Sequence, residues 1–362
     1  MSAPDPLSLP LVTIVTVCFN LLSGGRSKHF QECIQSVHDQ DFPHIEHLII
    51  DGASSDGTVD MLEELAQKGW IRYISEPDKG IYDAMNKAIR HAKGKYIAFL
   101  NSDDFWHDSR AVSASVEALE RTGAAFSYAP RHVIYEDGTI KYTESAVAGI
   151  FPLLMPFCHQ TMFTQKSALL RHNGFDDKNF KSAADYDLVF RMIISGEKGV
   201  FVPLNFTSFR LSGFSDGEGR DIGQQEMKQT WQRVLGDEVA ADFSQGFIRD
   251  TTFQDILQRV DSHIAMDMLH HFVSHTSGQY RLRHGLVQRD TKGFTVSRIM
   301  QQEESTVRLF GILPLLKCKS RTSRTDWSLF GFIPLLRKKD NQRTISYLLF
   351  FCLPILSIAK QR

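Results

Sequence analysis

The N-terminal part of the chain alternates four times between a short apolar run and an amphipathic helical segment, and this alternation limits the possible folds more than any other feature. The first run, residues 11–17, is rich in β-branched residues and is typical of a fully buried strand, and the other predicted strands cover residues 47–50, 71–74 and 95–100. The first helical segment repeats its apolar residues with a helical period, at Phe30, Cys33, Ile34 and Val37. The pattern predicts a Rossmann-like α/β fold, a doubly wound sheet with helices on both faces.

A polar cluster follows each predicted strand. Asn20 comes after the first strand and Asp51 after the second, and residues 76–79 and 101–104 follow the third and fourth. In open α/β sheets, ligands bind outside the carboxyl ends of the strands. We therefore expect the four clusters to meet at one edge of the sheet and to form a ligand site there.

Asp103 and Asp104 are adjacent carboxylates that directly follow a strand expected to be buried. Two like charges in such a position repel each other unless a cation lies beside them. Hard divalent cations take oxygen ligands and commonly use one or two carboxylates together with substrate phosphates. The pair therefore indicates a Mg²⁺ or Mn²⁺ site that binds a diphosphate. The alternative is a helix cap or a solvated turn.

Asp51 closes the second strand and begins a turn with glycines at 52 and 57. Glycine lets the backbone approach a ligand closely, and the carboxylate can accept a hydrogen bond from a base or a ribose. The alternative is an Asx turn in which Asp56 caps the helix that follows.

The second half of the chain has a different pattern. Asp137-Gly138 between alternating residues predicts a β-hairpin, so the sheet there is expected to be mixed or antiparallel. Residues 219–302 have mainly helical periodicity, and one stretch repeats an apolar residue at every fourth position, at Ile256, Val260, Ile264 and Met268. We expect three regions: an α/β domain over residues 1–218, a helical extension over 219–304, and a tail over 305–362.

The tail carries an internal repeat and a strong positive charge. Leu-Phe at 309, 329 and 349 is followed each time by a proline five residues after the leucine, so the period is 20 residues. Residues 305–362 contain eleven lysines and arginines against two aspartates, a net charge of +9 in a chain whose formal net charge is −1. The tail is expected either to pack on the body as turn or helical hairpins or to bind an anionic membrane surface, and we favour the membrane. Nucleic acid is not expected as a partner, because aliphatic residues dominate the repeat.

The remaining compositional features concern the cellular location. The longest apolar stretch, residues 345–358, contains Pro354 and is shorter than the ~20 residues that cross a bilayer. The N-terminus has an acidic residue and two prolines where a secretory signal would be basic and then apolar, and the five cysteines form no CxxC pair. These features predict a cytoplasmic protein that is peripheral on the inner face of the cell membrane.

Taken in order along the chain, several segments resemble glycosyltransferase family 2, which includes many bacterial polysaccharide and lipopolysaccharide sugar transferases. The matching segments are residues 15–20, 33–40, 49–58, 75–86, 94–104, 158–163 and 184–191. The resemblance implies a catalytic domain of the GT-A type that uses Mn²⁺ or Mg²⁺ and a UDP- or GDP-sugar. It also implies transfer with inversion to a hydroxyl of a glycan or lipid-linked glycan in cell-surface polysaccharide synthesis.

The resemblance also implies roles for individual residues on the donor side. Asp51 matches the position that binds the nucleobase or ribose, Asp103 the position that binds the ribose or sugar, and Asp104 the metal ligand. Because the signature is Asp-Asp rather than a spaced Asp-X-Asp, Asp103 is a second candidate for the direct metal ligand. Further donor contacts are expected from Asn20, Lys79, Asn86 and Arg210, although Arg210 could equally form a surface ion pair.

On the acceptor side, Asp185 matches the catalytic base of the family, which takes the proton of the attacking hydroxyl. Asp187 is expected instead to pair with Arg191 at i+4 on the same helix. His159 and Gln160 match an acceptor-side segment. The alternative for this histidine is a packing role inside the domain.

Two functions from other classes remain open from the sequence. A catalytically inactive scaffold would bind the nucleotide sugar without turnover. A sugar nucleotidyltransferase would make activated sugars, but the chain lacks a glycine- and lysine-rich phosphate loop near its N-terminus.

Overall fold

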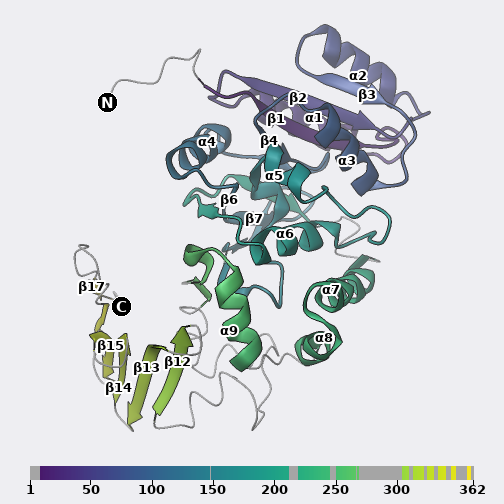
Figure 1. The fold of residues 1–362 in the computed structure, drawn as a ribbon. Helices are drawn as coiled ribbons and strands as arrows, with labels where there is room; N and C mark the ends of the chain where they lie inside the picture. The colour runs from purple at the N-terminus through teal and green to yellow at the C-terminus, as the bar shows by residue number, and fades with distance from the viewer. Residues whose placement is uncertain are drawn as a thin grey trace. The chain divides into compact units, whose positions relative to one another are not determined.

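The protein was analysed as a computed structural model (Figure 1), which describes residues 9–146, 148–211, 219–244, 250–265, 267–268, 304–309, 313–321, 324–329, 333–339, 344–347 and 357–359. The chain divides into two compact units. The first contains residues 1–230 and 261–267, and the second contains residues 231–260 and 268–362.

The first unit is built on a mixed seven-stranded sheet with the strand order β10-β6-β9-β4-β1-β2-β3. The neighbours β4, β1, β2 and β3 run parallel, β9 runs antiparallel to β4 and β6, and β10 is parallel to β6. The prediction of a parallel first half and a mixed second half is confirmed. The strands are β1 (Val12–Cys18), β2 (Ile45–Asp51), β3 (Arg72–Ser75), β4 (Tyr96–Phe99), β6 (Phe126–Tyr128), β9 (Phe163–Gln165) and β10 (Gly199–Phe201).

Helices cover both faces of this sheet. The predicted apolar face of α1, at Phe30, Cys33, Ile34 and Val37, is buried, and part of it forms a cluster with Ile49 of β2 and Leu62 of α2. Because alternate strand residues point to opposite faces, Leu48 and Ile50 point the other way, where α3 packs on β1 and β2. The helices are α1 (Ser27–His38), α2 (Thr58–Gln67), α3 (Ile81–His91), α4 (Ala111–Thr122), α5 (Lys166–Arg171) and α6 (Ala184–Ile194).

A second sheet has four strands in the order β5-β11-β7-β8, and its first strand along the chain, β5, is the strand that follows β4. The hairpin of β7 and β8 confirms the prediction from Asp137-Gly138, and Gly138 has the positive φ of 86° that this turn requires. The pairing of β11 with β5 brings Arg210 next to the segment that follows Asp103 and Asp104. The strands are β5 (Phe105–Trp106), β7 (Arg131–Ile134), β8 (Ile140–Glu144) and β11 (Thr207–Arg210).

The expected helical extension begins with α7 (Gly219–Leu235), and the limit between the two compact units falls inside this helix. The second unit continues with α8 (Asp237–Ser244) and α9 (Asp250–Arg259). Trp231 and Phe243 pack edge to face there, with ring centroids 5.5 Å apart. Within the described part of the chain, no helix is both long enough and apolar enough to span a bilayer.

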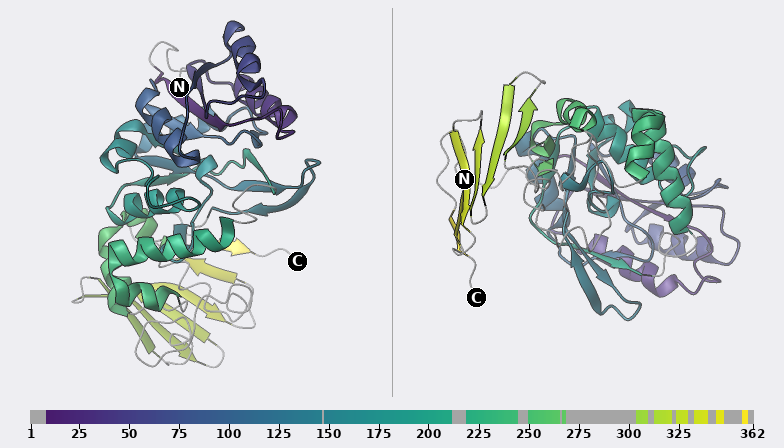
Figure 2. Two further views of the ribbon diagram at one scale, coloured as in Figure 1. Left: turned by 90° about the vertical axis from the view of Figure 1, so that its right-hand side faces the viewer. Right: turned by 90° about the horizontal axis from the view of Figure 1, so that it is seen from below.

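The tail forms six antiparallel strands in chain order, and Figure 2 shows them side by side. The 20-residue repeat corresponds to two strands. Arg308 pairs with Pro314 beside a bulge, and Ser328 pairs with Pro334 beside a second bulge 20 residues later. The hairpins that were the alternative to a membrane-bound tail are thus β-hairpins and not helical ones. The strands are β12 (Glu304–Leu309), β13 (Leu313–Arg321), β14 (Arg324–Leu329), β15 (Ile333–Lys339), β16 (Thr344–Tyr347) and β17 (Ser357–Ala359).

Candidate active site

The polar clusters meet at one edge of the seven-stranded sheet, because β1, β2, β3 and β4 are parallel and end there. The register places Asp51 beside Cys18 on one side and beside Ser75 on the other. Asn20, residues 76–79 and residues 101–104 follow the same ends. The prediction that the clusters share one edge is confirmed.

Asp51 is completely buried, and protein donors fill both of its carboxylate oxygens. Ser54 donates from its backbone nitrogen to Oδ2 at 2.9 Å and from its hydroxyl to Oδ1 at 2.5 Å. The Ser75 hydroxyl donates to Oδ2 at 2.7 Å, and the Cys18 thiol lies 3.7 Å from Oδ1. Burial and the neighbouring Asp51 charge raise the pKa of the Cys18 thiol, so this group remains a protonated donor. These contacts make Asp51 the anchor of the loop after β2.

The loop surface beside Asp51 carries an exposed aromatic side chain that the sequence analysis did not select. Phe19 directly follows β1 and is 53% exposed. A Cβ atom on Gly52 would lie 3.2 Å from the Phe19 ring and 2.7 Å from Oδ2 of Asp78, so a larger residue here would require both side chains to move. Asn20 holds the same loop, since its Oδ1 accepts from Ser55 N at 3.0 Å and it has a positive φ of 47°.

Lys79 and Asn86, both expected near the donor, lie in different surroundings. The Lys79 side chain is exposed at the sheet edge. Asn86 instead forms two hydrogen bonds with the backbone of Phe175. Nδ2 of Asn86 donates to the Phe175 carbonyl oxygen at 2.8 Å, and the Phe175 backbone nitrogen donates to Oδ1 of Asn86 at 2.9 Å. Both polar groups of Asn86 are thus used to join α3 to the segment before α6.

Asp104 is buried, with 1% of its surface exposed, and is held from two sides. Gln160 donates from Nε2 to Oδ2 at 2.6 Å, and the backbone nitrogen of Arg210 donates to Oδ1 at 2.6 Å. The Oε1 of Gln160 accepts from Asn101 N at 2.8 Å. The fully buried Gln160 side chain therefore fixes the loop that carries both aspartates.

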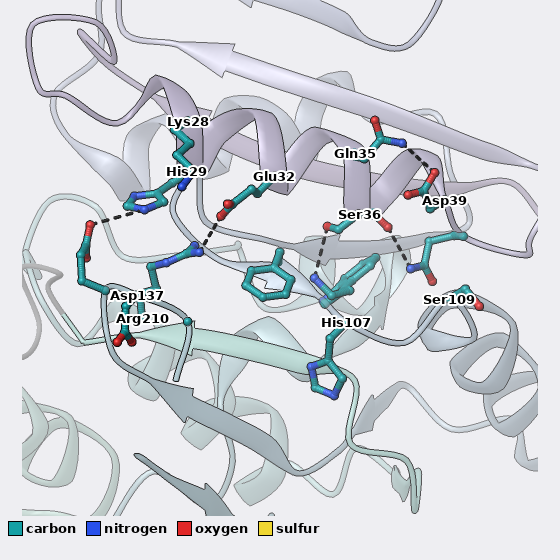
Figure 3. A pocket seen from close by; sticks show the side chains of 15 residues that line it. Lys28, His29, Glu32, Gln35, Ser36, Asp39, His107, Ser109, Asp137 and Arg210 are labelled. Carbon is teal, nitrogen blue, oxygen red and sulfur yellow. Dashed lines mark hydrogen bonds and ion pairs between the residues drawn. The ribbon is translucent and has the colours of Figure 1, made fainter. Parts of the chain in front are cut away.

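The Arg210 side chain is bound by two acceptors of the protein. Its guanidinium donates to the carbonyl oxygen of Asp103 and forms an ion pair with Glu32 of α1 at 2.6 Å, and only 4% of the side chain is exposed. Figure 3 shows this pair in a cavity of about 690 Å³ between α1 and the β7–β8 turn. Of the two predicted alternatives for Arg210, a phosphate contact and a surface ion pair, the structure shows an ion pair in which the arginine is buried and the glutamate is 38% exposed, and the arginine also supports the Asp103 backbone.

The two adjacent aspartates fit a divalent cation. Burial, and then the charge of Asp103, raise the pKa of Asp104, and the hydrogen bonds from Arg210 and Gln160 and the charge of Arg131 offset this rise only in part. Asp103 is half-buried and is the more accessible of the two. Within the described residues, no group of three or more His, Cys, Asp or Glu side chains is arranged to hold a metal ion, so the two aspartates alone would leave the ion short of ligands. A diphosphate would supply the missing oxygens.

Asp185 lies in the first turn of α6 and is bound by side chains from two other segments. His159 Nδ1 lies 3.0 Å from Oδ2, and the Tyr82 hydroxyl of α3 donates to Oδ1 at 3.1 Å. The backbone nitrogen of Tyr186 donates to Oδ1 at 2.9 Å. Burial opposes ionisation, but the hydrogen bonds from His159, the Tyr186 backbone and Tyr82 outweigh it and hold the pKa of Asp185 below its usual value. Asp185 is therefore ionised at neutral pH.

The N-terminus of α6 is fixed by a carboxylate that the sequence analysis also missed. Glu226 of α7 accepts hydrogen bonds from the backbone nitrogens of Lys181, Ser182 and Ala183 at 2.7, 2.9 and 2.7 Å. Further along the helix, Arg191 Nε donates to Asp187 Oδ2 at 2.8 Å, which confirms the predicted i+4 pair. Asp187 is completely buried in this pair.

A single short turn joins the two carboxylate sites. His159 and Gln160 are consecutive residues of the 3-10 helix His159–Thr161. The first contacts Asp185 and the second contacts Asp104. The structure thus brings together Asp103, Asp104, His159, Gln160 and Asp185, while Asn86 and Asp51 are occupied by structural hydrogen bonds.

Comparison with known proteins places the chain in a family. The family model described as glycosyl transferase family 2 matches residues 13–177. An uncharacterized glycosyltransferase of Mycobacterium tuberculosis is 33% identical over 192 residues, which cover 51% of this chain and 69% of that protein. The chain belongs to glycosyltransferase family 2.

Two further relatives extend the comparison of this family 2 protein. The putative teichuronic acid biosynthesis glycosyltransferase TuaG of Bacillus subtilis is 34% identical over 133 residues, which cover 36% of this chain and half of that protein. The mannosyltransferase PcManGT of Pyrobaculum calidifontis, solved in complex with GDP-Man and Mn²⁺, has 16% identity and a TM-score of 0.51 over 78% of this chain and 84% of that chain. This likeness confirms the GT-A fold.

Proposed function

We propose that this family 2 protein is an inverting, metal-dependent glycosyltransferase that transfers a sugar from a nucleotide diphosphate to a hydroxyl of a glycan or lipid-linked glycan. The observation that carries the proposal is the turn at 159–160, which contacts an ionised Asp185 on one side and the Asp103–Asp104 loop on the other. Inversion needs a base and a diphosphate site around one anomeric carbon, and this turn connects the two.

In the proposed reaction, Asp185 takes the proton of the acceptor hydroxyl while the oxygen of that hydroxyl forms a bond to the anomeric carbon. The bond between that carbon and the diphosphate oxygen breaks, and its electron pair leaves on the diphosphate. Attack from the face opposite the leaving group inverts the configuration. The lowered pKa of Asp185 keeps the carboxylate ready to accept the proton at neutral pH.

Asp103 and Asp104 would hold the Mn²⁺ or Mg²⁺ ion. A bound ion supplies positive charge that binds the diphosphate and stabilises it as it leaves. Gln160 and the backbone of Arg210 keep Asp104 in place, and Arg210 also holds the carbonyl of Asp103. We therefore assign Arg210 to the support of the acidic pair and not to a phosphate contact.

The donor site would lie along the neighbouring strand ends. Lys79 is exposed there and offers a charge for phosphate, and Asn20 shapes the loop after β1. Asp51 would act by anchoring the loop after β2, because its oxygens already accept protein hydrogen bonds. Asn86 is left out of the donor contacts because both of its polar groups bind the Phe175 backbone.

Phe19 is a candidate platform for the nucleobase. Stacking of a base on an aromatic side chain contributes roughly 1–3 kcal/mol, so Phe19→Ala is expected to weaken donor binding by roughly 5- to 150-fold. Calorimetric titration with the nucleoside diphosphate measures this effect. Leu22→Ala removes an apolar side chain of similar exposure, 43%, from the same loop and is the control. Equal affinities for wild type and Phe19→Ala would exclude the stacking role.

A donor screen tests the proposed function directly. Purified protein is incubated with a panel of UDP- and GDP-sugars and candidate glycan acceptors, and released nucleoside diphosphate is measured with Mn²⁺ and with EDTA. We expect acceptor-dependent release with one donor class, and its loss in EDTA. Donor binding without turnover under every condition would indicate an inactive scaffold. The family assignment itself argues against a sugar nucleotidyltransferase.

The tail is proposed to bind an anionic membrane surface, which would bring the enzyme to a lipid-linked acceptor. Its net charge of +9 supports this proposal, because each basic residue near such a surface contributes about 1 kcal/mol. Deletion of 305–362 is expected to abolish co-sedimentation with anionic liposomes. The triple change Arg337→Gln, Lys338→Gln and Lys339→Gln is expected to weaken it on the order of 100-fold.

The matched control for the tail is an equal loss of charge on the other unit, at Lys68, Arg90 and Lys93, which are exposed. These three glutamine changes should leave co-sedimentation unaltered. If both triple variants lose binding equally, the attraction is a general effect of charge and the tail is not the anchor. Neutral phosphatidylcholine liposomes give the baseline.

A further inference from the structure

His159 contacts the proposed base directly, whereas the sequence placed it only on the acceptor side and gave it no role in the reaction. Nδ1 of His159 lies 3.0 Å from Asp185 Oδ2, and about one fifth of each side chain is exposed, 20% and 21%. The histidine belongs to the turn that also carries Gln160, the residue bound to Asp104. Two contacts from consecutive residues, His159 to Asp185 and Gln160 to Asp104, therefore fix the position of the histidine relative to the acidic pair.

The hydrogen bonds of Asp185 leave room for a substrate at one oxygen. Each carboxylate oxygen has two lone pairs. At Oδ1 both are used, by the Tyr82 hydroxyl and by the backbone nitrogen of Tyr186. At Oδ2 one is used, by His159. An acceptor hydroxyl can therefore donate only to the second lone pair of Oδ2, next to the histidine.

The other nitrogen of the histidine ring indicates which tautomer is present. Nε2 is buried and has no hydrogen-bond partner in the part of the chain that the structure describes. If Nε2 carried the proton, its buried N–H would have no acceptor, and Nδ1 would present a lone pair to the carboxylate. If Nδ1 carries the proton, it donates to the carboxylate, and only a lone pair is left unpaired at Nε2. The neutral tautomer with its proton on Nδ1 is therefore favoured, so His159 donates to Asp185.

We propose that His159 is a positioning residue for the base, which holds the Asp185 carboxylate by its Nδ1–H so that the free lone pair of Oδ2 meets the acceptor hydroxyl. This inference rests on the proposed function, because it names a second residue of the same proton transfer. The proton of the acceptor still goes to Asp185, and the histidine keeps its own. Its bond also favours the ionised carboxylate that the transfer needs.

Three variants test this role. His159→Leu removes the donor at similar volume, and we expect kcat to fall roughly 10- to 100-fold with an unchanged KM for the donor sugar. His159→Asn places an amide N–H where Nδ1–H was and is expected to recover most of the loss. Tyr82→Phe removes a donor from Oδ1, which keeps its bond from Tyr186, and should cost less than His159→Leu. A fully active His159→Leu enzyme would overturn the proposal.

A pH profile separates positioning of the base from a purely structural role. Asp185 must be ionised, so kcat/KM falls as the pH drops through its pKa. Loss of the His159 hydrogen bond raises this pKa, so the acid limb of His159→Leu should move to higher pH and part of the loss should be recovered in alkaline buffer. The other titratable groups around the pair are Tyr82, Glu226 and, through Gln160, Asp104, and all three are unchanged in the variant. A limb that does not move contradicts the proposal.

A direct titration keeps this inference separate from the proposed function. The Asp185 carboxyl is followed by NMR in full-length protein labelled with ¹³C-aspartate and is assigned by its absence in Asp185→Asn. A higher pKa in His159→Leu than in wild type supports the dyad, and equal values overturn it. If wild type transfers no sugar in the donor screen, the proposed function fails while the titration still decides whether the histidine controls this carboxylate.

Discussion

Asp185→Asn is expected to lower the rate of sugar transfer by roughly 100- to 10,000-fold, the usual contribution of a general base, while donor affinity stays at the wild-type level. The amide cannot take the acceptor proton, but it has the same shape and can still accept from Tyr82 and the backbone of Tyr186. Turnover is measured by release of nucleoside diphosphate, and donor affinity by calorimetry. Wild-type turnover of this variant would remove Asp185 from the reaction.

The neighbouring Asp187 provides the matched comparison. It lies two residues further along α6 but is completely buried against Arg191 and accepts from Thr230. Asp187→Asn breaks this ion pair and is expected to cost about 3 kcal/mol of folding free energy, which lowers the melting temperature. Asp185→Asn should melt close to wild type. If instead Asp185→Asn lowered the melting temperature and Asp187→Asn lowered the turnover, the roles assigned to the two carboxylates would be wrong.

Asp104→Ala is expected to abolish metal-dependent turnover, a loss of roughly 1,000-fold or more, because the ion's stabilisation of the leaving diphosphate is worth several kcal/mol. Alanine also leaves Gln160 and the Arg210 backbone without their acceptor, so the isosteric Asp104→Asn is measured beside it. Both variants should lose the Mn²⁺-dependent increase in donor affinity. Retention of this increase in the asparagine variant would place the ion elsewhere.

Asp108→Asn is the control for the acidic pair. Asp108 lies four residues beyond Asp104 and forms an exposed ion pair with Arg110 at 2.7 Å. Hydrogen bonds from Arg110 hold the pKa of Asp108 at about 2, so the control removes a full negative charge at neutral pH. Turnover and metal dependence should be unchanged. A loss equal to that of Asp104→Asn would show that general surface charge, and not the buried pair, binds the donor.

The frame of the fold was predictable from local pattern. The four apolar runs became β1 to β4; β1, most of β2 and β4 are buried in a sheet covered on both faces, whereas β3 at the edge of the sheet is only partly buried. The period of α1 and the Asp137-Gly138 turn also gave correct elements. A helical period alone did not predict where a helix ends. The residues Ile256, Val260, Ile264 and Met268 are all buried, as expected for one helical face, but the helix is interrupted: α9 ends at Arg259, and helical residues resume at 262.

The contacts inside the site were not predictable in the same way. Tyr82 and Asp185 are separated by 103 residues in sequence, and Arg210 and Asp103 by 107. No periodicity encodes which distant side chain fills a lone pair, so the family resemblance could name the carboxylates but not their partners. The i+4 pair of Asp187 and Arg191 was found because helix geometry alone brings its members together.

The tail shows a similar division between pattern and geometry. Its 20-residue period was evident, but the same period suits strand pairs and helical hairpins. Backbone pairing decides the case, since equivalent bulges recur at Arg308 and Ser328 opposite two of the repeated prolines. Proline has no N–H for the ladder, and a bulge is where a strand tolerates it.

The adjacency of His159 and Gln160 constrains how this enzyme could diversify. One peptide unit separates the residue that touches the proposed base from the residue that touches the acidic loop. Lengthening or shortening that turn by a single residue would therefore move the proposed base relative to the acidic pair. Changes of acceptor preference would therefore be tolerated more easily in surrounding segments, such as the exposed strand β8, than in the turn at 159–160.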